Sequence, residues 1–387
     1  MNDFNFNTTP GIIFGKGASV SSCDRIIDKL GDNIFVITDA DLTKIELNKP
    51  IINKISKSSN LEVFDDVESD PSKKTLIKAL NSAKIFKPTG ILGFGGGSSM
   101  DIAKLVSLLM GTKQDIDNIW GVGNAKGPRL PLVLVPTTAG TGSEVTPISI
   151  ITVEDNEKKG VSTPIILPDL AVLDPELTLN LPSDITAATG VDAMVHAIEA
   201  YTSINQNNNP ISKLLAIEAL KLLGSSIETA VFDGQNIEAR KNMLLGSMMA
   251  GQAFANSPVS AVHALAYPIG GIFHIPHGLS NSLILPHVLK FNSINPKACE
   301  QYAFLAPFIF KDINLKTNNQ IICNEFIERL ENLSSLLNIP SKLRDIDIPK
   351  EACAKMAKES MKQTRLLVNN PREVTEEDAF NIYNAAW

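Results

Sequence analysis

The segment TGILGFGGGSSMD, residues 89–101, decides the fold of the N-terminal half of the chain. An apolar run ends at Phe94, three glycines follow it, and a helical pattern opens at Ser98. Glycines without Cβ atoms let backbone N–H groups approach an anion at a helix N-terminus. A tight strand-to-helix turn is the plainer interpretation, but three glycines cost conformational entropy that such a turn does not require. The segment therefore predicts a loop that binds a diphosphate.

Apolar runs typical of buried strands recur on both sides of this segment. They cover residues 33–38, 61–64, 131–135 and 171–173, and helical patterns cover residues 72–86 and 98–110. Strands rich in Val, Ile and Leu that alternate with helices predict a parallel sheet covered on both faces.

The pattern changes after about Pro182. Strand-like runs stop, and helical windows follow at residues 184–202, 211–232 and 237–255, with further helical segments to the end of the chain. The sequence predicts an α/β nucleotide-binding domain, residues 1–182, and an all-helical domain, residues 183–387.

Composition excludes several classes of protein. The 387 residues include 35 Lys and Arg against 42 Asp and Glu, a net charge of -7, so no basic surface is expected for nucleic acid. No apolar stretch reaches the ~18 residues that a bilayer requires, and the first residues do not resemble a signal peptide. The four cysteines are scattered without a CxxC pair, which suits a reducing cytoplasm.

Two further features concern a nucleotide. The loop PTTAGTGSEVT, residues 136–146, leaves an apolar strand and offers hydroxyls and amides to phosphate or ribose, although an ordinary turn has the same composition. Asp39 follows the strand that ends at Thr38, where its carboxylate can accept hydrogen bonds from ribose hydroxyls and repel a 2′-phosphate. This favours NAD over NADP, while a helix N-cap is the structural alternative. The acid precedes the glycine-rich loop, the reverse of the usual dinucleotide order.

All five histidines lie between residues 196 and 287. Asp192 and His196 are four residues apart on a helical stretch, so both project from one face and can hold one ion or simply bond to each other. Residues 263–277 add His263, His274 and His277 among apolar residues. One carboxylate with three imidazoles suits Fe²⁺ or Zn²⁺ rather than Ca²⁺ or Mg²⁺. Together with a dinucleotide loop, such a set indicates alcohol or carbonyl redox chemistry.

Four motifs in order along the chain resemble those of the iron-containing (group III) alcohol dehydrogenases. They are residues 95–101, residues 136–146, the stretch ATGVDAMVHAIEAY at residues 188–201, and the stretch from His263 to His287. The resemblance extends over the whole chain. It implies the dehydroquinate synthase-like fold of this family, with a Rossmann-like NAD-binding domain before a helical metal-binding domain.

The resemblance also implies residue roles. A divalent metal, Fe²⁺ or alternatively Zn²⁺, is expected at Asp192, His196, His263 and His277. The NAD contacts are expected at Asp39, Asp70, Gly95, Gly96, Gly97, Ser98, Thr137, Thr138, Thr141 and Lys158, with Asp70 near the adenosine ribose and Lys158 near the nicotinamide ribose. Phe254 matches an aromatic wall of the substrate pocket.

The chain departs from the family at Tyr267, where many members carry a histidine thought to assist proton transfer or substrate contact. Tyr267 can donate a hydrogen bond or serve as a pocket wall. His274, three residues before His277, becomes the candidate for proton transfer, with a supporting contact to ligand or substrate as its alternative.

The expected function is that of an NAD-dependent, iron-containing alcohol dehydrogenase. The metal polarises the oxygen of a small primary alcohol, diol or aldehyde, and hydride passes directly to or from nicotinamide. The alternatives are a glycerol-dehydrogenase-like enzyme of the same fold, a metal-dependent hydrolase and a nucleotide-binding sensor. Family members commonly form dimers or larger assemblies, so a homo-oligomer is expected.

Overall fold

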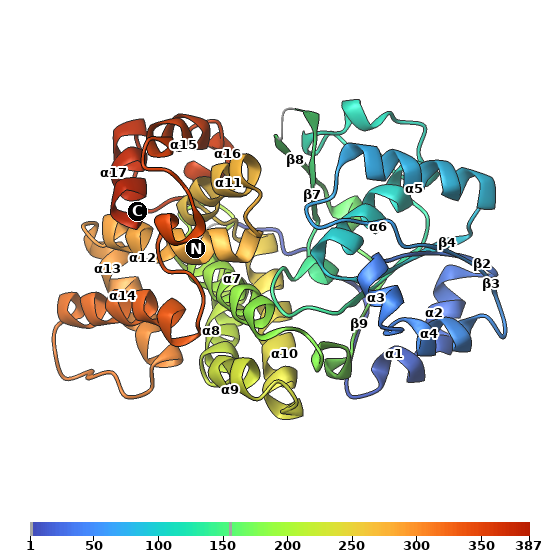
Figure 1. Ribbon diagram of the computed structural model, residues 1–387, viewed down its shortest axis with the longest axis horizontal. Helices are drawn as coiled ribbons and strands as arrows, with labels where there is room; N and C mark the ends of the chain where they lie inside the picture. Colours follow the sequence, from blue (N-terminus) through green and yellow to red (C-terminus); the bar gives the residue numbers. More distant parts are fainter. Residues whose placement is uncertain (1–2, 155–156) are drawn as a thin grey trace. The chain divides into compact units, whose positions relative to one another are not determined.

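Six short strands form a parallel sheet in the computed structural model, which describes residues 3–154 and 157–387 (Figure 1). Every neighbouring pair in this sheet is parallel. The strand order is β1 (Ile12–Phe14), β9 (Leu170–Leu173), β6 (Leu132–Pro136), β4 (Gly90–Gly95), β2 (Asn33–Ile37) and β3 (Asn60–Phe64). The five apolar runs that predict strands are β2, β3, β4, β6 and β9. The edge strand β1 was not predicted; its residues are exposed or only half-buried, so it lacks the continuous buried run of the inner strands.

Helices cover both faces of this sheet, as the apolar strands predict. In β2, Ile34 and Val36 pack in one core with residues of α2 (Cys23–Leu30) and α4 (Lys49–Ile55). Phe35 and Ile37 point the other way and pack in a second core with α5 (Lys73–Phe86) and α6 (Gly97–Gly111). The period of two along the strand places alternate side chains in the two cores.

The order of the strands brings three loops together at the carboxyl ends of the strands. The chain runs from β2 to the edge strand β3 and returns to β4 on the other side of β2. Ile37 of β2 lies beside Gly93 of β4, and Gly95 lies beside Pro136 of β6. The loops that follow these three strands therefore start at neighbouring positions at the carboxyl end of the sheet, where open α/β sheets bind their ligands.

A second, three-stranded sheet was not predicted. It consists of β5 (Gly121–Val122), β8 (Lys158–Ser162) and β7 (Ile148–Thr152), with β7 and β8 antiparallel. β8 begins Lys158-Lys159-Gly160 and is only half-buried over these residues, so its sequence lacks the apolar pattern of the main sheet. Among the described residues of the α/β part, two further α-helices are α1 (Ala18–Ser21) and α3 (Ala40–Lys44).

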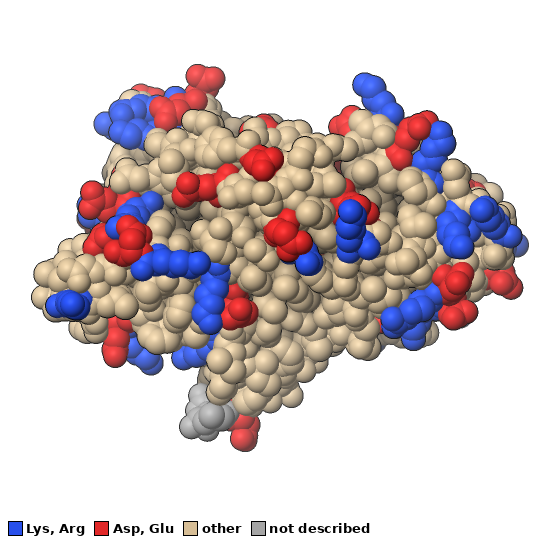
Figure 2. Space-filling model, turned by 90° about the horizontal axis from the view of Figure 1, so that it is seen from below, with Lys and Arg blue, Asp and Glu red and all other residues tan. Residues whose placement is uncertain are grey.

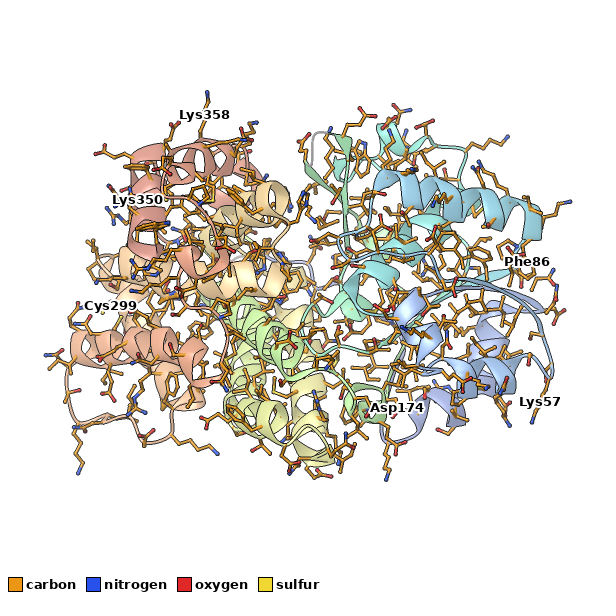
Figure 3. All side chains as sticks on the ribbon, in the orientation of Figure 1. Lys57, Phe86, Asp174, Cys299, Lys350 and Lys358 are labelled. Atoms are coloured by element: carbon orange, nitrogen blue, oxygen red, sulfur yellow. The ribbon has the colours of Figure 1, made fainter. Side chains whose placement is uncertain are left out.

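The chain divides by its internal contacts between Asn180 and Leu181. Residues Asn7–Asn180 form the α/β unit, whose start is tied to its end because Asp174 accepts hydrogen bonds from the N–H groups of Gly17 and Ser19 (Figure 3). Residues 3–6 belong instead to the helical unit, although the expected first domain includes them. Asn207 Oδ1 accepts from the Asn5 N–H at 2.8 Å, and Asn207 Nδ2 donates to the Asn5 carbonyl at 2.9 Å.

After Leu181 the described residues form helices and no strands, which confirms the predicted fold class of a Rossmann-like sheet and an all-helical C-terminal region. The helices are α7 (Ser183–Thr202), α8 (Pro210–Gly224), α9 (Ile227–Phe232), α10 (Ile237–Asn256), α11 (Ala261–Phe273), α12 (His277–Asn292), α13 (Pro296–Ile309), α14 (Asn319–Leu336), α15 (Ala352–Ser360), α16 (Thr364–Leu367) and α17 (Glu376–Ala386). The predicted window 211–232 is two helices, α8 and α9, which a short break at Ser225 and Ser226 separates.

The central helix α7 packs against α8, α10 and α12. Gly278 at the start of α12 allows the closest approach, since a Cβ atom there would lie 2.5 Å from the carbonyl oxygen of Ala188 on α7. This contact places the next residues of α12 beside Asp192.

The surface carries both signs of charge. Basic and acidic side chains are interspersed over the face in Figure 2. Within the part of the chain that the structure describes, no helix is long and apolar enough to cross a bilayer. All four cysteines are buried and form no disulfide, among them Cys299 on α13 (Figure 3).

Candidate active site

The glycine-rich loop ends at an uncapped helix. Gly96 is the N-cap residue of α6, and no side chain caps the helix. The first N–H groups of an α-helix have no partner within the helix, so those of α6 are available to an anion. This arrangement supports the diphosphate role predicted for Gly96 and Gly97.

The loop after β6 lies directly against the glycine-rich loop. A Cβ atom on Gly97 would lie 2.8 Å from Thr141 Cγ2, and one on Gly96 would lie 3.5 Å from Thr138 Cγ2. The N–H of Thr137 donates to the carbonyl of Gly95 at 3.0 Å. The structure thus brings together the predicted cofactor residues of both loops, and a side chain at position 97 would require that of Thr141 to shift.

Asp39 lies at the same carboxyl end of the sheet and caps a helix. Its Oδ1 accepts a hydrogen bond from the N–H of Leu42 at 2.9 Å, so it is the N-cap residue of α3. Its Oδ2 faces the glycine-rich loop, 3.4 Å from where a Cβ atom on Gly95 would stand. Burial raises the pKa of Asp39 against the hydrogen bond from Leu42. The N-cap and the ribose interpretations are therefore compatible, because each uses a different oxygen.

Asp70 and Lys158 form an ion pair. Lys158 Nζ lies 2.6 Å from Asp70 Oδ1, and the Asp70 N–H donates to Ser98 Oγ at 3.2 Å. Asp70 also has a positive φ of 53°. Two residues expected near different riboses thus contact each other beside Ser98, and their expected roles remain predictions.

A buried lysine on α6 joins this helix to the loop after β6, and it was not predicted from the sequence. Lys104 Nζ donates to Ser143 Oγ at 2.7 Å and to the carbonyl of Ile148 at 2.7 Å. Ser143 Oγ in turn donates to Asp101 Oδ1 at 2.7 Å. Burial lowers the pKa of Lys104 to about 8, against the attraction of Asp101. The spacing of Asp101 and Lys104 by three residues on a helix was the available signal.

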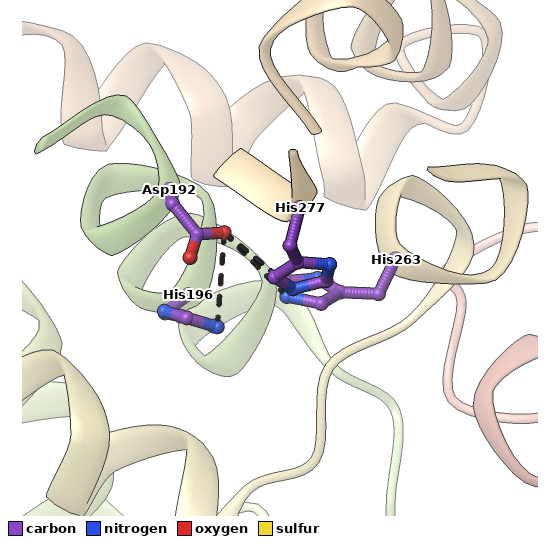
Figure 4. A group of neighbouring side chains, drawn as sticks. All are labelled: Asp192, His196, His263 and His277. Carbon is purple, nitrogen blue, oxygen red and sulfur yellow. Dashed lines mark ion pairs between the residues drawn. The ribbon is translucent and has the colours of Figure 1, made fainter. Parts of the chain in front are cut away.

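In the helical unit, four predicted ligands converge (Figure 4). Asp192 and His196 project from α7, His263 from α11 and His277 from the first turn of α12. One ligand atom from each residue lies within 4.8 Å of all the others. The Nε2 atoms lie 4.0 Å (His196), 4.0 Å (His263) and 3.8 Å (His277) from Asp192 Oδ1.

Burial and charge suit this cluster to a cation. The side chains of Asp192, His196 and His263 are at most 5% exposed, whereas His277 is 36% exposed, so the cluster opens to solvent on the His277 side. Burial lowers the pKa of His196 to about 4, which keeps its imidazole neutral at pH 7. Burial by itself raises the pKa of Asp192, but the three imidazoles hold it below its ordinary value. Neutral imidazoles and an ionised carboxylate are the forms that bind a divalent transition metal.

Glu199 supports the cluster and was not predicted from the sequence. Its Oε2 lies 2.6 Å from His263 Nδ1, and its Oε1 accepts from Ser260 Oγ at 2.8 Å and from the Val262 N–H at 2.7 Å. Burial by itself raises the pKa of Glu199, but hydrogen bonding from His263 holds it below its ordinary value. A carboxylate on Nδ1 keeps the proton there and leaves the Nε2 lone pair for a metal. The signal in the sequence was its position three residues after His196.

Two of the remaining predicted residues, Phe254 and Tyr267, lie beside the cluster, and His274 is not among its contacts. Phe254 on α10 stacks on the His196 ring with centroids 4.3 Å apart. The Tyr267 ring lies 6.1 Å from that of His277, and Tyr267 Oη accepts a hydrogen bond from Arg365 Nη2 at 3.2 Å. His274 is exposed and ends α11 with a positive φ of 56°, and it does not belong to the group of four converging ligands.

A parallel sheet with anion-binding loops and a buried set of three imidazoles and one carboxylate define a class of metal-dependent, nucleotide-linked enzymes. Comparison with known proteins then identifies the family. The family described as "Iron-containing alcohol dehydrogenase" matches residues 9–175, and "Fe-containing alcohol dehydrogenase family, C-terminal" matches residues 186–387. The chain belongs to the iron-containing alcohol dehydrogenase family and is an oxidoreductase, as the sequence motifs predict.

Three relatives illustrate the family. Long-chain-alcohol dehydrogenase 1 of Geobacillus thermodenitrificans is 38% identical over 372 residues, which cover 93% of this chain and 91% of that protein. A crystal structure of 1,3-propanediol oxidoreductase covers 100% of both chains at 29% identity, with a TM-score of 0.94. Sulfoacetaldehyde reductase of Bifidobacterium kashiwanohense, solved in complex with NAD⁺, is 28% identical with a TM-score of 0.87 and covers 99% of this chain and 98% of its own.

Proposed function

We propose that this protein is a metal-dependent, NAD(H)-linked alcohol dehydrogenase or aldehyde reductase that acts on a small primary alcohol, diol or aldehyde. The observation that carries the proposal is the convergence of Asp192, His196, His263 and His277 in a buried cluster, with Glu199 on the far nitrogen of His263. A protein that only bound a nucleotide would have no use for this cluster.

The donor set fits a divalent transition metal. Three imidazole nitrogens and one carboxylate oxygen are ligands of Fe²⁺ and Zn²⁺, and we propose Fe²⁺ with Zn²⁺ as the alternative. When bound, the ion supplies Lewis acidity for the substrate oxygen, and NAD(H) supplies or accepts the hydride. His196, Asp192 and His263 exclude water from one side of the cluster, and the exposed edge of His277 leaves room for a substrate.

For the cofactor, we propose that the uncapped N-terminus of α6 and Thr137, Thr138 and Thr141 bind the diphosphate region. Asp39 Oδ2 would accept a hydrogen bond from the adenosine ribose, which favours NAD over NADP. For the riboses, we propose that Asp70 lies near that of adenosine and Lys158 near that of nicotinamide, and their ion pair holds the two side chains in place.

For the substrate, we propose that Phe254 forms an apolar wall and that Tyr267 faces the open side of the cluster. Tyr267 Oη accepts from Arg365, so its own hydrogen remains to be donated. His274 is the proposed route by which the proton reaches solvent, since it is the exposed imidazole nearest in sequence to His277.

Two further points are proposals. The free, buried cysteines suit a reducing cytoplasm, and the family resemblance suggests a homo-oligomer. The names of the relatives above include a long-chain alcohol, a diol and an anionic aldehyde, so a substrate test must cover these chemistries.

The decisive experiment is NADH oxidation with a panel of short, long, hydroxylated and anionic aldehydes. The protein is assayed as purified, after chelation, and after addition of Fe²⁺ under anaerobic conditions or of Zn²⁺. We expect activity that chelation abolishes and one ion restores. Full activity after complete removal of metal would contradict the proposed role of the cluster.

A further inference from the structure

Asn281 lies inside the cluster of ligands and has no assigned role. It is on α12, four residues after His277, so both side chains leave the same face of the helix. Asn281 is completely buried. Its Nδ2 donates to Asp192 Oδ1 at 2.6 Å and lies 3.3 Å from His263 Nε2 and 3.2 Å from His277 Nε2.

The contacts to the two imidazoles face the lone pairs that would hold a metal, and the contact to Asp192 uses one of the two lone pairs on Oδ1. In the neutral tautomer that donates Nδ1–H to Glu199, His263 Nε2 has one lone pair and no hydrogen. That lone pair can accept an N–H hydrogen or bind a cation, but not both. The amide nitrogen of Asn281 thus occupies the position of a cation with respect to Asp192 and His263.

The separation of the ligands agrees with this role. An ion with bonds of about 2.0–2.1 Å in tetrahedral geometry requires its ligand atoms to lie about 3.4 Å apart. The three Nε2 atoms lie 3.8 to 4.0 Å from Asp192 Oδ1. These separations are slightly longer than those around an ion, and the Asn281 amide nitrogen lies among three of the ligands.

The oxygen of the Asn281 amide lies in an unfavourable environment. Asn281 Oδ1 is buried, and no partner for it is found among the described residues. An unpaired buried acceptor is unfavourable, so the orientation of the amide is explained by the hydrogen bonds of Nδ2 to the ligands.

We propose that the Asn281 amide is an internal substitute for the metal ion: it stabilises the metal-free ligand cluster and gives up these contacts when the ion binds. The inference rests on the proposed metal centre. Asn281 is then a positioning residue of the metal-free state. Because its amide competes with the ion, it lowers the affinity of the ligand cluster for that ion. Without the amide, the ionised carboxylate of Asp192 and the facing imidazole lone pairs would lie together in a buried site without a donor.

The test compares Asn281→Ala with wild type and with Ser282→Ala. Ser282 is the matched control because it is the next residue of α12, is also buried, and donates only to the carbonyl of Leu279 on its own helix. Dissociation constants for Zn²⁺, and for Fe²⁺ under anaerobic conditions, are measured by competition with a chelator. Thermal midpoints are measured with and without the ion.

We expect Asn281→Ala to bind Zn²⁺ about tenfold more tightly than wild type, because a hydrogen bond to a charged acceptor no longer competes. The metal-free variant should melt at a lower temperature than metal-free wild type, while the loaded proteins should melt alike. Ser282→Ala should change neither constant.

Weaker or unchanged metal binding by Asn281→Ala would overturn the inference, as would an equal loss of stability with and without metal. If Asn281→Ala cannot be prepared without metal, Asn281→Ser, which keeps a shorter donor, is measured in the same way. Tighter Zn²⁺ binding than wild type then supports the inference, and equal or weaker binding overturns it. Failure of the wild-type protein to bind either ion would instead contradict the proposed metal centre.

Discussion

Replacing Glu199 with glutamine is expected to weaken metal binding while the helical unit remains folded. The glutamine side chain would keep an oxygen that can accept from Ser260 Oγ and the Val262 N–H, as Glu199 Oε1 does at 2.8 and 2.7 Å. Its amide nitrogen cannot accept a proton from His263 Nδ1, the contact that Glu199 Oε2 makes at 2.6 Å. The imidazole then loses the partner that keeps the Nε2 lone pair available.

The size of the effect follows from the kind of contact. Removing the hydrogen-bond partner of a metal-binding imidazole typically costs 10- to 100-fold in affinity, or ~1.4 to ~2.8 kcal/mol. Glu199→Ala would in addition leave the buried N–H of Val262 without an acceptor, at a cost of about 1–3 kcal/mol in the free energy of unfolding. The two variants therefore separate the effect on the metal from the effect on α11.

The assay is a competition titration with Zn²⁺ and a chromophoric chelator, together with unfolding of the metal-free proteins in denaturant. Glu199→Gln should bind Zn²⁺ 10- to 100-fold more weakly and unfold close to wild type, and Glu199→Ala should be impaired in both. Wild-type affinity in Glu199→Gln would refute the reasoning, because it would mean that the carboxylate does not select the form of His263.

Three other predictions concern single residues. Burial raises the pKa of Glu144 to about 7, so between pH 4.5 and 7 the folded protein keeps a proton that the unfolded chain has released. The free energy of unfolding should therefore fall by up to ~3 kcal/mol as the pH rises through this range. Denaturant unfolding of Glu144→Gln should show no such fall. Asp39→Asn keeps an N-cap acceptor but loses the charge, and should raise kcat/KM with NADPH relative to NADH by at least about tenfold; an unchanged ratio would remove Asp39 from cofactor selection. His274→Ala should lower kcat by roughly tenfold and change its pH profile, whereas wild-type turnover at every pH would show that the proton leaves by another route.

Much of the fold could be predicted because its signals are local. The buried strands β2, β4 and β6 are apolar runs of five or six residues, and the glycines after β4 mark the turn into α6. The strands of the second sheet could not be predicted in this way. β8 carries Lys158 and Lys159 and gains its structure from pairing with β7, which is a contact between segments and not a local preference.

The ligand residues could also be proposed from the sequence, since Asp192 and His196 are spaced for one helix face and the motif around His263 and His277 supplied the others. The residues that support them gave no comparable signal. Glu199 and Asn281 are ordinary helical residues in the sequence, and each acquires a role only because α7, α11 and α12 pack together.

The sequence by itself determined the fold class, the glycine-rich loop and the types of ligand, because strand and helix periodicities and residue chemistry are properties of short segments. Only the tertiary structure decided how these parts combine. It placed Asp39 opposite Gly95 although the acid comes first in the chain, since β2 and β4 are neighbours in the sheet. It also joined Asp70 to Lys158. These contacts depend on which distant segments are packed side by side, and the distances between their side chains are set by that packing alone.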